Sequence, residues 1–208
     1  MPTWSPGYAA VRWAQTASVG VVPNPAMPRV FMATAVDIGE DRTPAGGPHV
    51  RDKQDVGKRL ALAFRDNFVD GDGPFYTPGA IALSARTTNH SGDDVGSAVA
   101  VTFGNLPPGP HPLLPPSSTL GLEVSPGNST DANAPWLNVS SVTLLGDGKS
   151  LLIGSELKSV KQVRYLWADN ACLGWNSSTS QRETGPYRCP LYTSGGLPVL
   201  PFVITVTG

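Results

Sequence analysis

The sequence has no excess of positive charge: 15 Lys and Arg stand against 16 Asp and Glu in 208 residues, a formal net charge of −1. Without a basic run or face, nucleic acid and anionic membrane are poor partners. No apolar stretch approaches the ~20 residues that a membrane-spanning helix needs. The start, Met1–Pro6, has no basic residue followed by an apolar run, so it does not have the pattern of a signal peptide.

Cysteine is also scarce, since Cys172 and Cys189 are the only two. An even count at close spacing allows one disulfide, whereas two reduced cysteines in a cytosolic protein are the alternative. Two cysteines with no nearby His cannot supply the four ligands of a structural zinc, so we expect no metal and no cofactor. Four Asn-x-Ser/Thr sites favour a secretory route and possible N-glycans, at Asn89, Asn128, Asn138 and Asn176.

Glycine and proline are abundant instead, with 23 and 21 residues, a mixture typical of a loop-rich, mostly β protein. Residues 1–72 nevertheless have an α/β pattern. Residues 8–16 predict a short helix, and the apolar run 30–36 predicts a buried strand, which a polar loop follows.

The helix after this loop has the strongest local signals. Asp52 is a plausible N-cap, Asp55 lies near the positive end of the helix, and the turn residues 70–74 end it. Apolar residues follow at helical spacing, namely Val56, Leu60, Ala63, Phe64 and Phe68. Residues 1–72 therefore predict helix, buried strand, loop and helix, a fragment of an α/β sheet.

Residues 73–208 change to a period of two, which predicts an all-β, sandwich-like domain. The strands that we expect are 98–103, 120–124, the hairpin of 139–145 with 150–153, 163–167 and 202–206. The Pro-rich insertion at 106–118 predicts an extended, solvent-exposed segment.

The most informative residue for function is His49, which stands in the loop just ahead of the second helix. A His on a loop that a rigid helix supports can act as a catalytic base, whereas a surface His in a polar loop is the alternative. No Gly-x-Ser-x-Gly or Gly-Gln-Ser-Asn motif supplies a nucleophile, and Ser18 and Ser84 lack a supporting context.

Several segments, taken together and in order, resemble the sialate O-acetylesterases, a family of serine carboxylic-ester hydrolases of the SGNH type. The similar segments are Tyr8–Gln15, Val36–Glu40, Pro48–Leu62, Leu120–Val124, Val163–Asn170, Cys189–Tyr192 and Gly196–Phe202. The resemblance implies that residues 1–72 are the end of a three-layer α/β hydrolase domain and that 73–208 are its accessory β-domain. The chain would then be the C-terminal part of a secreted or lysosomal enzyme.

This family uses a serine to attack the acetyl ester, a His to take the serine proton and an acid to orient the His. The resemblance makes His49 the catalytic His, and we expect Asp37 as its acid, with Asp41 as the second choice. The chain departs from the pattern at two places: Gly46 stands where many SGNH enzymes have Asp, and Val50 stands where the family has Pro.

The family's serine and oxyanion-hole blocks lie upstream of the matched segments, so we expect this chain alone to be inactive. O-acetylated sialic acid, or another acetylated sugar, is the implied partner. Two other readings remain. One is a non-catalytic carbohydrate-binding module, with sugar-stacking candidates Trp136, Trp167, Trp175, Tyr165 and Tyr187, all of which could instead fill the core. The other is a structural domain that completes a partner's active site through a sheet edge at residues 30–37.

Overall fold

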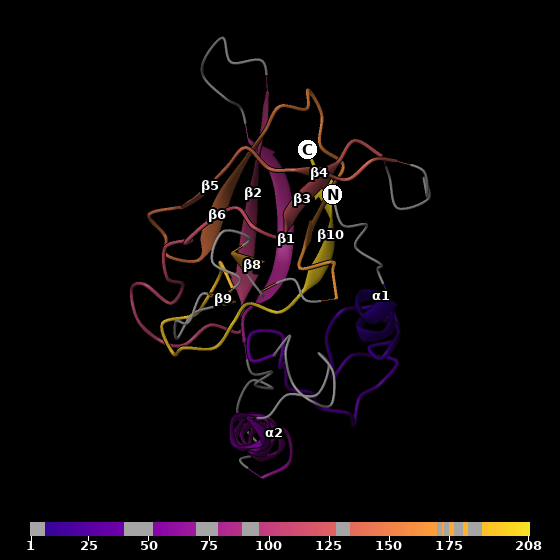
Figure 1. Cartoon of the computed structure of the whole chain (residues 1–208), viewed down its shortest axis with the longest axis vertical. Helices are drawn as coiled ribbons and strands as arrows, with labels where there is room; N and C mark the ends of the chain where they lie inside the picture. Colours follow the sequence, from indigo (N-terminus) through magenta and orange to yellow (C-terminus); the bar gives the residue numbers. More distant parts are fainter. Residues whose placement is uncertain are drawn as a thin grey trace.

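The described residues form two helices and ten strands (Figure 1). The computed structural model of the chain describes residues 7–39, 52–69, 79–88, 96–127, 134–169, 172 and 189–208, and the backbone alone of 175–176 and 181–182. Helix α1 spans Gly7–Ala14 and helix α2 spans Lys53–Phe68, as the sequence predicts. Asp52 is the N-cap of α2: its carboxylate accepts a hydrogen bond from the Asp55 amide at 3.0 Å.

Eight strands form one mixed sheet in the order β4-β3-β7-β10-β1-β2-β6-β5, and β8 pairs with β9 in a separate ribbon. Neighbours are antiparallel except β1 and β10, which run parallel. The strands are β1 (Ile81–Thr88), β2 (Ser97–Gly104), β3 (Leu122–Ser125), β4 (Leu137–Asn138), β5 (Ser141–Leu144), β6 (Ser150–Ser155), β7 (Gln162–Tyr165), β8 (Trp175–Asn176), β9 (Gln181–Arg182) and β10 (Phe202–Thr207).

The sheet curls into a half-barrel around one core. Phe202 of β10 packs edge-to-face on Phe103 of β2 and also against Tyr165 of β7, with both ring centroids 5.8 Å away. Buried side chains from β3, β6 and β7, such as Val124 and Ile153, belong to the same cluster. Side chains from both halves of the curled sheet share this core. The sheet therefore covers its own apolar face, which a second sheet covers in a sandwich.

The mostly β character of the C-terminal part is thereby confirmed, but the strands described here do not form the two facing sheets that the sequence predicts. The hairpin of β5 and β6, joined by residues 145–149, is confirmed. Strand β1 was not among the predicted strands, and Ala85 is the one buried residue of its eight.

The strand predicted at 30–36 is wrong. Residues 31–35 carry no strand assignment, and this segment is absent from both sheets of the described residues. An apolar run needs a neighbouring strand to become part of a ladder, and here it meets helix α2 instead: the Phe31 ring contacts those of Phe64 and Phe68.

The prediction that 106–118 is solvent-exposed is also wrong in its middle. Leu113 is 2% exposed and belongs to the core. Its amide donates to the Gly148 carbonyl at 3.2 Å, and the Leu114 amide donates to the Tyr192 carbonyl at 2.9 Å. These bonds hold the Pro-rich segment against the β5–β6 turn and against the segment that carries Tyr192. As for the helices, neither α1 nor α2, the two in the described part of the chain, has the length and apolarity to span a membrane.

Candidate functional site

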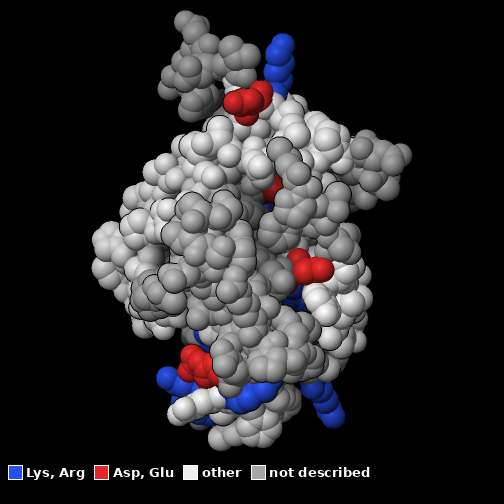
Figure 2. Space-filling model, in the orientation of Figure 1, with Lys and Arg blue, Asp and Glu red and all other residues white. Residues whose placement is uncertain are grey.

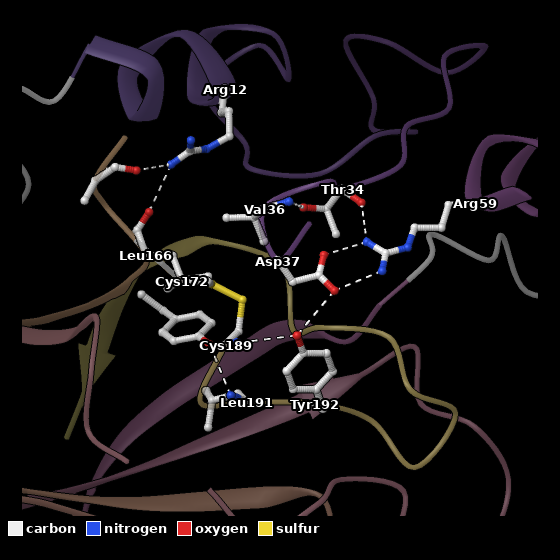
Figure 3. Close-up of a disulfide and its surroundings, with 12 residues drawn as sticks. Arg12, Thr34, Val36, Asp37, Arg59, Leu166, Cys172, Cys189, Leu191 and Tyr192 are labelled. Atoms are coloured by element: carbon white, nitrogen blue, oxygen red, sulfur yellow. Dashed lines mark hydrogen bonds and ion pairs between the residues drawn. A yellow bond between two sulfur atoms is a disulfide. The ribbon is translucent and has the colours of Figure 1, made fainter. Parts of the chain in front are cut away.

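A buried ion pair joins the segment after residue 30 to helix α2. Asp37 is 4% exposed and Arg59 of α2 is 7% exposed. Arg59 donates from Nη1 to Asp37 Oδ1 at 2.6 Å and from Nη2 to Asp37 Oδ2 at 2.9 Å (Figure 3). Nη1 also donates to the Thr34 carbonyl at 2.8 Å. Such a two-pronged pair fixes both the distance and the orientation of the helix relative to the segment.

The electrostatics of this pair favour the charged form of Arg59. Burial by itself lowers the pKa of the Arg59 guanidinium, but hydrogen bonding to Asp37 and the negative charge of Asp37 outweigh burial and raise that pKa above its ordinary value. Two opposite charges held in one buried place compensate each other, whereas either alone would be costly.

Tyr192 connects the same carboxylate to the β-rich part of the chain. Its hydroxyl donates to Asp37 Oδ2 at 3.3 Å and accepts from the Cys189 amide at 3.4 Å. Cys189 forms a disulfide with Cys172, which confirms the bond that the cysteine spacing allowed. Behind it, the hydroxyl of Tyr165 accepts from the Leu191 amide at 3.2 Å, and burial raises the pKa of this hydroxyl.

Of the predicted catalytic residues, only Asp37 belongs to the part of the chain that the structure describes. His49 and Asp41 lie outside the described residues, so their roles stay predictions. Asp37 and Asp52, which bracket the segment that carries His49, are both described, and the ion pair and the N-cap hold them in place. The Asp37 carboxylate accepts three hydrogen bonds, two from Arg59 and one from Tyr192.

A cavity of about 340 Å³ lies between α1, residues 32–36 and residues 166–169. Trp13 and Trp167 line it, in edge-to-face contact at 5.6 Å. Arg12 lines it too, and its Nη2 donates to the carbonyls of Leu166 at 3.1 Å and Ala168 at 2.7 Å. Burial lowers the pKa of Arg12, and the nearby charge of Asp169 opposes that shift.

The remaining candidate residues have mixed outcomes. Tyr165 is fully buried in the core, so it cannot stack on a sugar. Trp136 lies under the Arg164 guanidinium at 4.2 Å. Of the predicted glycan sites, Asn138 is exposed on β4, Asn89 and Asn128 lie outside the described residues, and only the backbone of Asn176 is described. No group of three or more His, Cys, Asp or Glu side chains that could hold a metal ion occurs among the residues described.

Sequence reasoning missed Arg59 and Tyr192. A signal for Arg59 was present: it stands between Val56 and Ala63, three residues after one and four before the other, so it shares their helix face. An Arg on the face that packs inward needs a buried carboxylate as its partner. Tyr192 gave no such signal, because its bond to Asp37 joins residues 155 positions apart.

No protein-family model matches the chain. Curated proteins do match. The Sialate O-acetylesterases of Pongo abelii and Homo sapiens are each 32% identical to it over 207 residues, which is 97% of this chain. That of Rattus norvegicus is 30% identical over the same length. The class of protein that this chain resembles is therefore the carbohydrate esterases.

Within that class, the chain is homologous to the sialate O-acetylesterases, which confirms the resemblance drawn from its sequence, and it corresponds to a C-terminal part of them. It spans about a third of their length: 34% of the Pongo abelii and human proteins and 33% of the rat protein.

Proposed function

We propose that this chain is the base-carrying C-terminal part of a carbohydrate O-acetylesterase. The observation that carries the proposal is its similarity to proteins named Sialate O-acetylesterase over 97% of its length. The proposed substrate is an acetyl ester on a sialic acid or a similar sugar. The division into an SGNH-type portion at 1–72 and an accessory β-domain at 73–208 is part of this proposal, as is a secreted or lysosomal location with N-glycans.

In the proposed reaction a serine hydroxyl attacks the acetyl carbonyl while His49 takes its proton. His49 then gives the proton to the departing sugar oxygen, and water hydrolyses the acetyl-serine. Neither the serine nor an oxyanion hole is recognisable in this sequence, so we propose that residues outside it supply both and that the chain alone does not turn over acetyl esters.

The geometry of Asp37 supports a role in orienting His49. A carboxylate has about four lone-pair sites, and the described bonds use three of them. The site that remains is on Oδ1, where an imidazole N–H from the adjacent segment could donate. In this proposal Arg59 holds the Asp37 carboxylate in place, and Asp37 stabilises the imidazolium that forms when His49 accepts a proton.

The proposal is tested with a chimera in which these 208 residues replace the matching third of the human relative. We expect the chimera to release acetate from an O-acetylated sialic acid and this chain alone to release none from p-nitrophenyl acetate. A folded chimera that hydrolyses no acetyl ester would contradict the proposal. So would turnover by the isolated chain that is lost on His49→Ala.

The cavity beside α1 keeps a second candidate function open, a sugar-binding module. Its volume of about 340 Å³ lies in the range of small-molecule sites, and Trp167 is only partly buried beside it. Isothermal titration with N-acetylneuraminic acid tests this function. Binding that Trp167→Ala abolishes and Trp136→Ala leaves intact, in a chimera with no esterase activity, would favour the module.

A further inference from the structure

Helix α2 turns most of its apolar residues to solvent rather than to the sheet. Leu60 is 40% exposed, Phe64 49% and Phe68 47%, whereas Arg59 and Ala63 are the residues of α2 that are buried. The helix lies at the end of the molecule remote from most of the sheet (Figure 1). A helix normally buries its apolar stripe, but no element among the described residues covers this face.

The exposed face continues onto the segment that precedes Asp37. The rings of Phe31, Phe64 and Phe68 contact one another with centroids 5.4 to 5.8 Å apart. Val30, at 40% exposed, and Val69, at 62%, extend the patch on either side. We call Val30, Phe31, Leu60, Phe64, Phe68 and Val69 the apolar end surface. Contiguous apolar patches of this kind mark interaction sites.

The main chain beside this surface is also open to pairing. The main-chain groups of Phe31, Met32 and Ala33 form no hydrogen bond with the main chain of any other described residue. The composition of 30–36 is that of a buried strand, and an unpaired strand-like segment is a template for another strand. The wrong strand prediction thus has a physical reason: the sequence suits a ladder whose other member is absent from the described residues.

We infer that the apolar end surface is the docking site of the remaining two thirds of an acetylesterase, which would cover Phe64 and Phe68 and pair a strand with residues 31–33. This inference rests on the proposed function. The relatives are about three times as long as this chain, so they contain the mass that such a surface requires. Leu60 follows Arg59 in α2, and Arg59 holds Asp37, so a partner seated on this surface would lie near the proposed orienting acid.

Basic side chains lie near the apolar end surface. Figure 2 shows Lys and Arg side chains gathered at the end of the molecule that α2 forms. Apart from the buried and paired Arg59, helix α2 carries Lys53, Lys58 and Arg65 against Asp55 and Asp66. Exposed lysines beside an apolar surface fit a covering surface that has an apolar centre and carboxylates at its edge.

The test measures association between this chain and the remaining two thirds of the human relative, expressed as a separate polypeptide, by sedimentation velocity. We expect a one-to-one complex that Phe64→Ser/Phe68→Ser weakens at least tenfold. Leu120→Ser is the matched control, because Leu120 is 48% exposed at a distant turn, and it should leave binding unchanged. Thermal melts of all the variants show that each one is folded under the conditions of the binding measurement.

Equal binding by the double variant overturns the inference, and so does self-association of this chain that the same variant abolishes. Because a separate polypeptide can fail to fold, a fused version provides a second measurement. In the fusion, Phe68→Cys should react with maleimide at least tenfold more slowly than in this chain alone, whereas Leu120→Cys should react equally in both. Equal rates for Phe68→Cys also overturn the inference.

Different results refute the proposed function and the docking site. An assembly that forms as expected but hydrolyses no acetyl ester refutes the proposed function and leaves the docking site standing. An active assembly that is indifferent to Phe64→Ser/Phe68→Ser does the reverse.

Discussion

Tyr192 donates a hydrogen bond to Asp37 at 3.3 Å, across 155 positions of the sequence. Through this bond the segment that leads to His49 is tied to the β-rich part of the chain. Arg59 ties the same carboxylate to helix α2. Asp37 is therefore the point at which three parts of the chain meet, and the first prediction concerns the strength of that junction.

Arg59→Met should lower the free energy of unfolding by about 3–5 kcal/mol, because it leaves the Asp37 carboxylate buried without its cation. Arg65→Met is the matched control in the same helix: Arg65 is 54% exposed in its pair with Asp66, so its loss should cost at most about 1 kcal/mol. Urea denaturation measures both values. Similar losses for the two variants would show that the buried pair has no special weight.

A double variant separates the pair from its parts. Asp37→Leu/Arg59→Met removes both charges, so we expect it to lose clearly less stability than the sum of the single variants. Strict additivity in this cycle would mean that Asp37 and Arg59 do not interact.

Reduction of the Cys172–Cys189 disulfide should lower the free energy of unfolding by roughly 3 kcal/mol, because it releases a closed loop in the unfolded chain. The two cysteines are 17 positions apart, and β8 and β9 lie between them. Chemical denaturation with and without dithiothreitol measures the change. Cys172→Ala/Cys189→Ala should be insensitive to the reductant, and sensitivity in that variant would assign the effect to something other than this bond.

Asp147 should make the β5–β6 hairpin sensitive to acid. Its carboxylate accepts from the amides of Lys149 and Ser150, both at 2.9 Å, and from the Ser150 hydroxyl at 2.7 Å. The hydrogen bond from the Lys149 amide is the main reason why the pKa of Asp147 lies below its usual value of 3.8. The folded chain therefore binds this proton less readily than the unfolded chain does.

The contribution of Asp147 is thus complete above the ordinary Asp pKa of 3.8 and is lost as pH falls through the lower pKa of the folded state. Asp147→Ala should cost about 1 kcal/mol at neutral pH, because the side chain is exposed and screened. The difference between the two proteins should shrink as pH falls below 3.8, as thermal melts across pH would show. A difference that is constant with pH would assign the cost to the turn backbone instead.

Local signals predicted much of the fold. The Asp52 cap and the spacing of apolar residues predicted α2, and alternation with turn residues predicted β2, β3, β6, β7 and β10. What local signals could not give is the partner of each surface. The apolar spacing of Leu60, Phe64 and Phe68 is correct for a helix, yet these residues face solvent because nothing in the described chain covers them.

The candidate site was predictable only in part, for the same reason. Asp37 stood out as a carboxylate at the end of an apolar run, but its bonds to Arg59 and Tyr192 depend on tertiary structure. The burial of Leu113 within a Pro-rich segment is a similar case, because contacts with residues 148 and 192 decide it and the local composition does not.

The most direct test of the central claim is the effect of His49→Ala on acetate release by the chimera with the human relative. We predict a loss of kcat of at least about a hundredfold, since general base catalysis contributes that much or more. His111→Ala, at an exposed position, is the matched control and should leave kcat unchanged. If His49→Ala keeps full activity in a folded chimera, residue 49 is not the base, and the account of this chain as the base-carrying part of an acetylesterase is wrong.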